Sequence, residues 1–141
     1  MTKKTSNAKL NQERLAKAIG FHQSGEFSKA KKLYEKLIKL DRENTEALHL
    51  LGLLYRQKEN SKLSIKYQSQ AVNLKPGELR YVKALADVYF SLNDFESVLN
   101  LVSKQIASNN LDDEILLKQG YSFLHLKNIN DALTSFQKAL T

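Results

Sequence analysis

Three histidines and one acidic cluster are the side chains of this sequence that could carry acid–base chemistry or hold a metal ion. The histidines, His22, His49 and His125, fall on three separate segments of the chain. The acidic cluster DDE at residues 112–114 could bind a cation, but acidic residues also favour a helix N-terminus, whose dipole attracts negative charge. We interpret the histidines as exposed residues of helical surfaces and the cluster as a helix start, and we predict no metal site.

Other common signatures of catalysis are missing from the sequence. The chain has no cysteine, so neither a disulfide framework nor a thiolate zinc site can form. Its five glycines are scattered and make no phosphate-binding loop. We therefore predict that the chain is not an enzyme and needs no cofactor.

The elements that position these residues follow from a repeat with a period of 34 residues. Ala or Gly recurs at one position of the repeat, and Phe or Tyr recurs three residues later. Small and aromatic residues that recur at one spacing indicate one supersecondary unit, stacked several times. The two columns are Ala18, Gly52, Ala86 and Gly120, and Phe21, Tyr55, Tyr89 and Phe123.

Each copy reads as two helices joined by a tight turn. In the second copy, Leu48, Leu51 and Tyr55 lie on one face of a helix, because they are spaced i, i+3 and i+7. Polar residues 59–61 then interrupt the apolar pattern, a second apolar stripe follows, and Pro76 ends the unit. Neither helix can bury its whole apolar face within one copy, so the copies must stack.

This pattern resembles the tetratricopeptide repeat, a helical hairpin of the same length. The second copy carries the resemblance best, and the third departs from it at Val98 and Gln105, which replace small residues. The resemblance implies an all-α fold, a right-handed superhelical solenoid of antiparallel helix-turn-helix repeats. We predict a disordered, Lys-rich tail over residues 1–10 and a repeat domain over 11–141, with copies at 11–44, 45–78, 79–112 and 113–141.

The two ends of the array differ in polarity. Arg14 and Lys17 make the outer face of the first helix polar, as the start of a solenoid requires. At the other end, Leu133 and Leu140 are expected to face the place where a fifth copy would pack. Two explanations stay open: a chain truncated at Thr141, or self-association through this uncapped edge. In the first case the repeats would precede a catalytic domain of a larger bacterial enzyme, such as a glycosyl-, sulfo- or methyltransferase.

The resemblance also implies a binding surface, since proteins of this kind bind peptides or helices along their first helices. We expect a non-catalytic protein–protein interaction scaffold whose concave groove combines apolar and basic residues. The residues carried over to this groove are Leu15, Ile19, Leu53, Arg56, Arg80, Lys83, Asp87, Phe90, Leu117, Tyr121 and Leu124.

The formal net charge of +7 also raises the question of nucleic-acid binding. Lysines of the predicted tail carry part of this charge, and no column of the repeat holds matching polar residues that could read bases. We therefore favour a protein or peptide partner and keep nucleic acid as the weaker alternative. No apolar run reaches the roughly 18 residues that a membrane span needs, so we predict a cytoplasmic protein without membrane contact.

Overall fold

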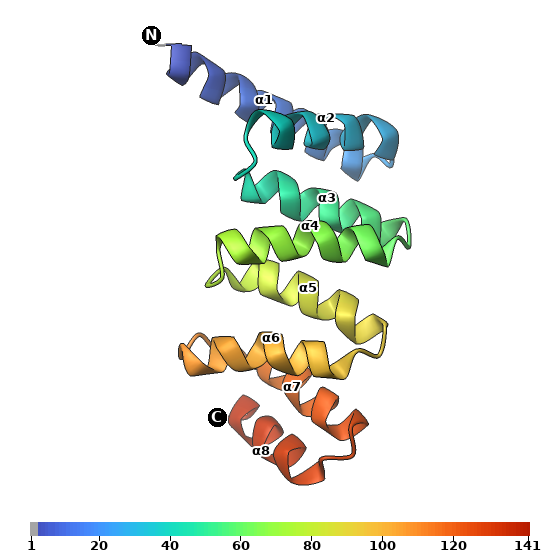
Figure 1. Cartoon of the computed structure of the whole chain (residues 1–141), viewed down its shortest axis with the longest axis vertical. Helices are drawn as coiled ribbons and strands as arrows, with labels where there is room; N and C mark the ends of the chain where they lie inside the picture. Colours follow the sequence, from blue (N-terminus) through green and yellow to red (C-terminus); the bar gives the residue numbers. More distant parts are fainter. Residues whose placement is uncertain (1–2) are drawn as a thin grey trace. The chain divides into compact units, whose positions relative to one another are not determined.

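The computed structural model of the chain describes residues 3–141, which fold into eight helices without any strand (Figure 1). This confirms the all-α prediction. The helices are α1 (Lys3–Gln23), α2 (Phe27–Leu40), α3 (Thr45–Gln57), α4 (Ser61–Leu74), α5 (Leu79–Ser91), α6 (Phe95–Ala107), α7 (Asp113–His125) and α8 (Ile129–Ala139).

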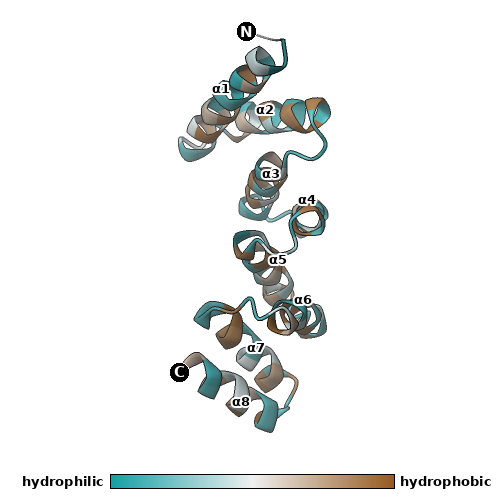
Figure 2. Ribbon diagram, turned by 90° about the vertical axis from the view of Figure 1, so that its left-hand side faces the viewer, coloured by the Kyte–Doolittle hydropathy of each residue, from teal (hydrophilic) through white to brown (hydrophobic). Residues whose placement is uncertain are grey.

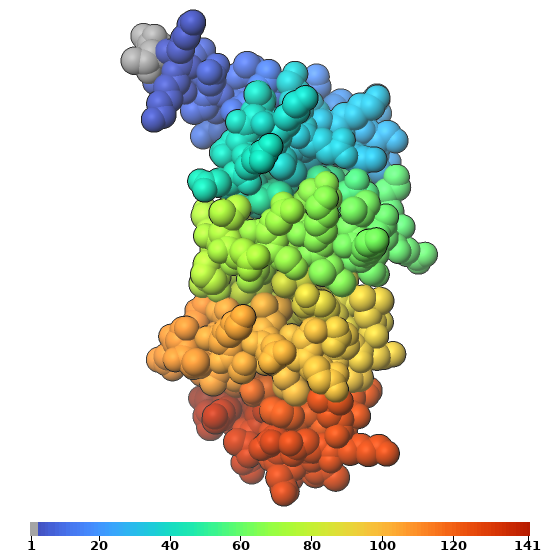
Figure 3. Space-filling model, viewed as in Figure 1, coloured from blue at the N-terminus to red at the C-terminus, as the bar shows by residue number. Residues whose placement is uncertain are grey.

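The chain divides into two compact units. The first unit, Met1–Leu74, contains α1 to α4, and the second unit, Lys75–Thr141, contains α5 to α8. Within each unit every helix packs against the next one in sequence, and in the first unit the residues of the successive hairpins form adjoining bands (Figure 3). Most helices present both apolar and polar residues, while the turns between them are mainly polar (Figure 2).

The turn inside each hairpin repeats with the sequence period. Gly25, Glu59, Asn93 and Lys127 all have a positive φ, between 58° and 80°. After each of them, the next backbone N–H donates to the carbonyl of the aromatic column, as from residue 60 to Tyr55 at 2.8 Å. A left-handed residue followed by this hydrogen bond is the Schellman ending of a helix. The turn therefore ends the first helix of every hairpin at the same place.

The residue after each left-handed position also starts the second helix. The side chains of Asn60, Asp94 and Asn128 accept hydrogen bonds from backbone N–H groups three residues later, at 3.1, 3.2 and 3.3 Å. Such N-caps satisfy a helix donor that would otherwise lack a partner. Glu26 occupies the corresponding place in the first hairpin and makes no such cap. One residue thus serves both helices in three of the four hairpins.

Close packing of the hairpins depends on the column of small residues. Ala18 and Ala86 are fully buried. A Cβ built on Gly52 would lie 2.8 Å from the side chain of Gln68, and one on Gly120 would collide with the ring of Phe136. In the first unit this column joins a buried cluster formed by Ala18, Ala30, Tyr34, Leu51, Leu54 and Tyr55.

A disordered tail is predicted over residues 1–10, whereas the structure gives residues 3–10 as the start of α1, and Met1 and Thr2 lie outside the described residues. Helix α1 begins at Lys3 and continues without a break to Gln23. Residues 3–10 contain no Gly or Pro and are all exposed. Helix propensity, rather than packing, therefore stabilises this first part of α1. Helices α3, α5 and α7 begin at residues 45, 79 and 113, the first residues of the predicted second, third and fourth copies.

The third hairpin accommodates the residues that depart from the repeat pattern. Val98 is fully buried, and Gln105 is 5% exposed. The amide of Gln105 donates to the carbonyl of Pro76 at 2.9 Å and accepts from the Asn110 amide at 3.0 Å. The polar groups of the Gln105 side chain therefore have hydrogen-bond partners before α5 and after α6. This glutamine, which replaces a small residue of the repeat, links the segment before α5 to α6. Among the described residues, no helix combines the length and apolarity needed to cross a membrane.

Candidate binding surfaces

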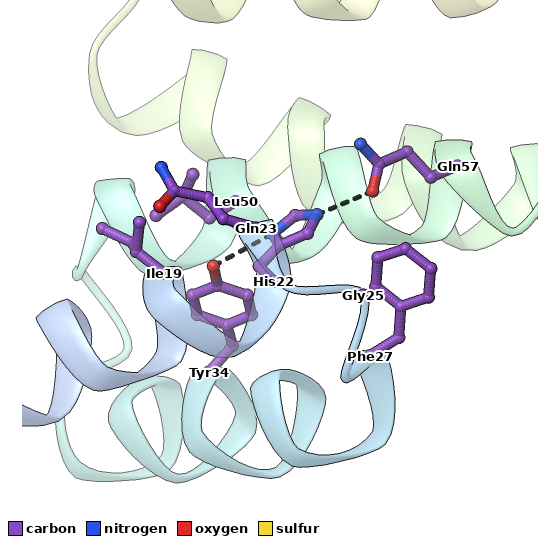
Figure 4. Close-up of a pocket in the computed structure, with 8 residues that line it drawn as sticks. All are labelled: Ile19, His22, Gln23, Gly25, Phe27, Tyr34, Leu50 and Gln57. Atoms are coloured by element: carbon purple, nitrogen blue, oxygen red, sulfur yellow. Dashed lines mark hydrogen bonds between the residues drawn. The ribbon is translucent and has the colours of Figure 1, made fainter.

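The first unit contains a pocket of about 420 Å³ at the turn end of its hairpins (Figure 4). Its apolar walls come from Ile19 at the end of α1, Phe27 at the start of α2 and Leu50 of α3. Polar groups complete the lining on the side of His22 and Gln57. The full lining is Ile19, His22, Gln23, Gly25, Phe27, Tyr34, Leu50 and Gln57.

His22 holds the polar side of this pocket together. Its Nδ1 lies 3.0 Å from the Tyr34 hydroxyl, and its Nε2 lies 2.8 Å from Oε1 of Gln57 (Figure 4). Burial and, secondarily, the charge of Glu46 raise the pKa of Tyr34 to about 12, so this hydroxyl keeps its proton and can donate to Nδ1. The Nε2–H of His22 then donates to Oε1 of Gln57. Both ring nitrogens are engaged, which suits a rigid pocket wall better than a general base.

The expectation that all three histidines are exposed is wrong for His49. This residue is 5% exposed, and its Nδ1 lies 3.0 Å from Oε1 of Gln68, whose amide donates to the His49 carbonyl at 3.2 Å. Gln68 stands where the repeat family places an aromatic residue. A glutamine at an apolar position was the signal in the sequence that a buried polar partner should exist nearby. His125, in contrast, is exposed and stacks on Phe95 with 4.5 Å between ring centres.

The second unit presents an apolar stripe on α7. Leu117, Tyr121 and Leu124 are 40%, 49% and 47% exposed, and their spacing of i, i+4 and i+7 places them on one face of the helix. The ring of Tyr121 meets that of Phe136 edge-on at 5.2 Å, which fixes one side of the tyrosine while half of its surface stays accessible. We call these three residues the α7 stripe.

Charged residues link α5 to α7 beside this stripe. Lys83 pairs with Asp112 and, at 3.1 Å, with Glu114, and Lys118 pairs with Asp87. The ammonium group of Lys118 also lies 5.4 Å from the centre of the Phe90 ring. Lys83 was expected to contribute positive charge to the groove, and in the structure its carboxylate partners neutralise that charge. The surface therefore alternates paired charges with apolar side chains.

The pair between Lys83 and Asp112 shifts both groups toward their charged forms. Burial alone would raise the pKa of the Asp112 carboxyl, but hydrogen bonds from Lys83 and from the Ile115 backbone outweigh it and lower that pKa. The hydrogen bond to Asp112 raises the pKa of Lys83 despite partial burial. Asp112 also caps α7, since its Oδ1 accepts from the Ile115 N–H at 2.9 Å. The acidic cluster thus starts a helix, and no metal-binding group of His, Cys, Asp or Glu occurs in residues 3–141.

The structure places the residues predicted for the binding surface on the first helices of the hairpins. In the first unit, Leu15 packs on the buried cluster and Ile19 lines the pocket. Leu53 is half-buried and Arg56 is exposed. In the second unit, α5 carries Arg80, Lys83, Asp87 and Phe90, and α7 carries the α7 stripe.

Two residues that these predictions lacked lie at the pocket and beside the α7 stripe. Tyr34 reaches the pocket from a second helix, α2, whereas the predicted surface used only first helices. Lys118 pairs with Asp87 across hairpins, and the repeat register contained no signal for a pair between residues of different copies.

Solved structures define the class of the protein. MamA matches with a TM-score of 0.81 at 18% identity, over 96% of this chain and 74% of its own. A tetratricopeptide repeat protein from Parabacteroides merdae matches with 0.83 at 20%, over 91% of this chain and 51% of its own. A thermophilic TPR protein from Thermus thermophilus matches with 0.68 at 19%, over 92% and 73%. The chain thus has the tetratricopeptide-repeat fold, as its period predicts.

The family of the chain is shown by a comparison of its sequence with models of known protein families. The family described as ChAPs, the Chs5p-Arf1p-binding proteins, matches residues 3–133, and the chain belongs to it. None of the curated proteins matches the chain.

Proposed function

We propose that this chain is a non-catalytic scaffold that binds a peptide or helix of a partner protein through the first helices of its hairpins. The observation that supports the proposal most is the α7 stripe, where three large apolar side chains stay accessible on a helix that also buries Ile115 and Leu116. Exposed apolar residues grouped on one helix face are typical of sites that bind amphipathic helices.

The paired charges beside the stripe support the same function. Lys83, Asp87 and Lys118 are held in place by ion pairs, so they present fixed charges rather than mobile ones. Fixed charges around an apolar centre select the orientation of a partner, because wrongly placed charges repel. The proteins after which the matched family is named bind Chs5p and Arf1p, and this name supports a protein as the class of partner.

Affinity capture with matched variants tests the proposal. The native chain, a Leu117→Glu, Tyr121→Glu variant and a Leu133→Glu, Leu140→Glu variant would each be used to capture proteins from the source lysate after nuclease treatment. Leu133 and Leu140 are 54% and 87% exposed, so both variants change exposed positions and circular dichroism should show unchanged folding.

The proposal predicts a captured protein that only the first variant loses. Loss with the second variant alone would move the interface to the edge formed by α8 and favour self-association there. Capture by the native chain that occurs with untreated lysate and is lost after nuclease treatment of the lysate would favour nucleic acid instead.

A further inference from the structure

The net positive charge of this chain comes from its first unit. Residues 1–74 hold 15 of the 22 Lys and Arg residues but only 7 of the 15 Asp and Glu residues, which leaves a net charge of +8. Residues 75–141 hold the other 7 basic and 8 acidic residues and carry a net charge of −1. Such asymmetry concentrates attraction for an anionic partner on one unit.

Helix α2 gathers this charge on one line. Lys32, Lys36 and Lys39 are exposed, and their spacing of i, i+4 and i+7 places them on the same face of the helix. Lys29 extends the line by one turn toward the start of α2. The opposite face of α2 holds the buried residues Ala30, Tyr34 and Leu37, so the helix cannot rotate to hide these lysines.

Nearby carboxylates neutralise Lys29, at the start of this line, and Lys31 beside it. Lys29 pairs with Glu26 at 2.7 Å, and Lys31 lies 3.9 Å from Glu35. Lys32, Lys36 and Lys39 make no ion pair among residues 3–141. Three adjacent ammonium groups on consecutive turns repel one another and gain from an external set of carboxylates with the same spacing.

Apolar side chains lie next to the lysines. Leu33, Lys36 and Leu40 follow the spacing i, i+3 and i+7, so the two leucines lie along one side of the lysine line on α2. Leu40 is 55% exposed, while Leu33 is half-buried against the core of the first unit. A partner that covers this face therefore meets both positive charge and apolar surface.

We propose that the outer face of α2, formed by Lys32, Lys36, Lys39 and Leu40, binds an acidic amphipathic helix of a partner protein. This site is separate from the α7 stripe. Carboxylates spaced i, i+4 and i+7 on the partner would meet the three lysines, and an apolar residue beside them would cover Leu40. The line contains no arginine to chelate phosphate and no exposed aromatic ring to stack on bases, which favours a protein over nucleic acid.

The test measures binding of a defined probe to the full chain. The probe is a short, fluorescent, alanine-based helical peptide with glutamates spaced i, i+4 and i+7 and a leucine beside them. A second peptide of the same composition spreads the glutamates around the helix. Binding of both is followed by fluorescence anisotropy at low and physiological salt, because screening weakens contacts between exposed charges.

Two variants with equal changes of charge separate a site from general attraction. Lys32→Glu, Lys36→Glu, Lys39→Glu reverses the proposed site. Lys3→Glu, Lys4→Glu, Lys9→Glu reverses three exposed lysines in the part of α1 that buries no residue. All six positions are exposed, so both variants should fold, and circular dichroism checks this.

The proposal predicts that the matched peptide binds the native chain and the α1 variant alike and binds the α2 variant on the order of tenfold more weakly. Equal weakening in both variants, or equal binding of the two peptides, would overturn it. A single-stranded oligonucleotide that binds more tightly than the matched peptide, with loss in the α2 variant, would also overturn it and assign the face to nucleic acid.

Discussion

Gln68 of α4 occupies the space that a side chain at Gly52 of α3 would need. A Cβ at position 52 would lie 2.8 Å from the Cγ, Cδ and Nε2 atoms of Gln68. The glutamine cannot withdraw easily, because both ends of its amide are bonded to His49. Close approach of the two helices and the buried polar pair therefore depend on one another.

Gly52→Ala is accordingly expected to destabilise the chain. Overpacking of a filled core costs about 1–3 kcal/mol, and here it also strains the Gln68 hydrogen bonds. Urea unfolding measures the change. Gly20→Ala is the matched control, since Gly20 is an exposed helical residue with no atom within 4 Å of an added Cβ, and it should gain about 0.5–1 kcal/mol. Equal effects of the two substitutions would contradict this account of Gly52.

The two buried glutamines should differ in what their removal costs. Gln68→Ala takes the acceptor from the buried Nδ1–H of His49 and leaves a cavity, so we expect a loss of about 3 kcal/mol. Gln105→Ala also leaves a cavity, but the Pro76 carbonyl that loses its donor is exposed and water can replace the donor, so about 2 kcal/mol is expected. Thermal unfolding of both variants measures the order, and a larger loss for Gln105→Ala would contradict it.

The hairpin turns predict a stabilising substitution. Lys127 holds a φ of 61°, which is costly for a residue with a Cβ, and its equivalent in the first hairpin is Gly25. Lys127→Gly should raise the free energy of unfolding by about 0.5 kcal/mol, since relief of strain exceeds the entropic cost of glycine. Lys127→Ala keeps the strain and serves as the control. A glycine variant no more stable than the alanine variant would argue against strain at this turn.

The ion pair between Lys83 and Asp112 should make stability depend on pH at the acid side. The pKa of Asp112 is lowered in the folded state, so the pair stabilises the fold above the ordinary Asp pKa and loses this effect as pH falls through the lower folded pKa. We expect Asp112→Asn to be less stable than the native chain above about pH 5, with the gap closing below about pH 3. Asn keeps the cap to Ile115, so the comparison isolates the charge, and Asp113→Asn controls for loss of one negative charge at the same helix start. A gap that stays constant with pH would contradict the pairing.

The sequence predicted the helices well because the repeat period combines many weak signals. The small and aromatic columns, with the polar turn at residues 59–61, placed the helix starts at residues 45, 79 and 113 correctly. No such column covers residues 3–10, where exposed residues continue α1 without packing.

Side-chain partners were harder to predict than helices. His49 lies at a position expected on the surface, and its burial depends on the glutamine that replaces an aromatic residue nineteen positions later. Lys83 was expected to add positive charge to the groove, and Asp112 and Glu114, which neutralise it, belong to another part of the repeat pattern. Such pairs depend on which polar side chains meet, within one hairpin for His49 and between hairpins for Lys83, and the periodic pattern of apolar residues does not contain that information.

The most direct test of the proposed scaffold is photo-crosslinking from single positions. A benzophenone amino acid would replace Tyr121 in one chain and Leu133 in another, both exposed and on different helices of the second unit. With the captured partner protein, we expect a cross-linked product from position 121 and none from position 133. A product from position 133 alone would contradict binding at the α7 stripe and place the partner on α8.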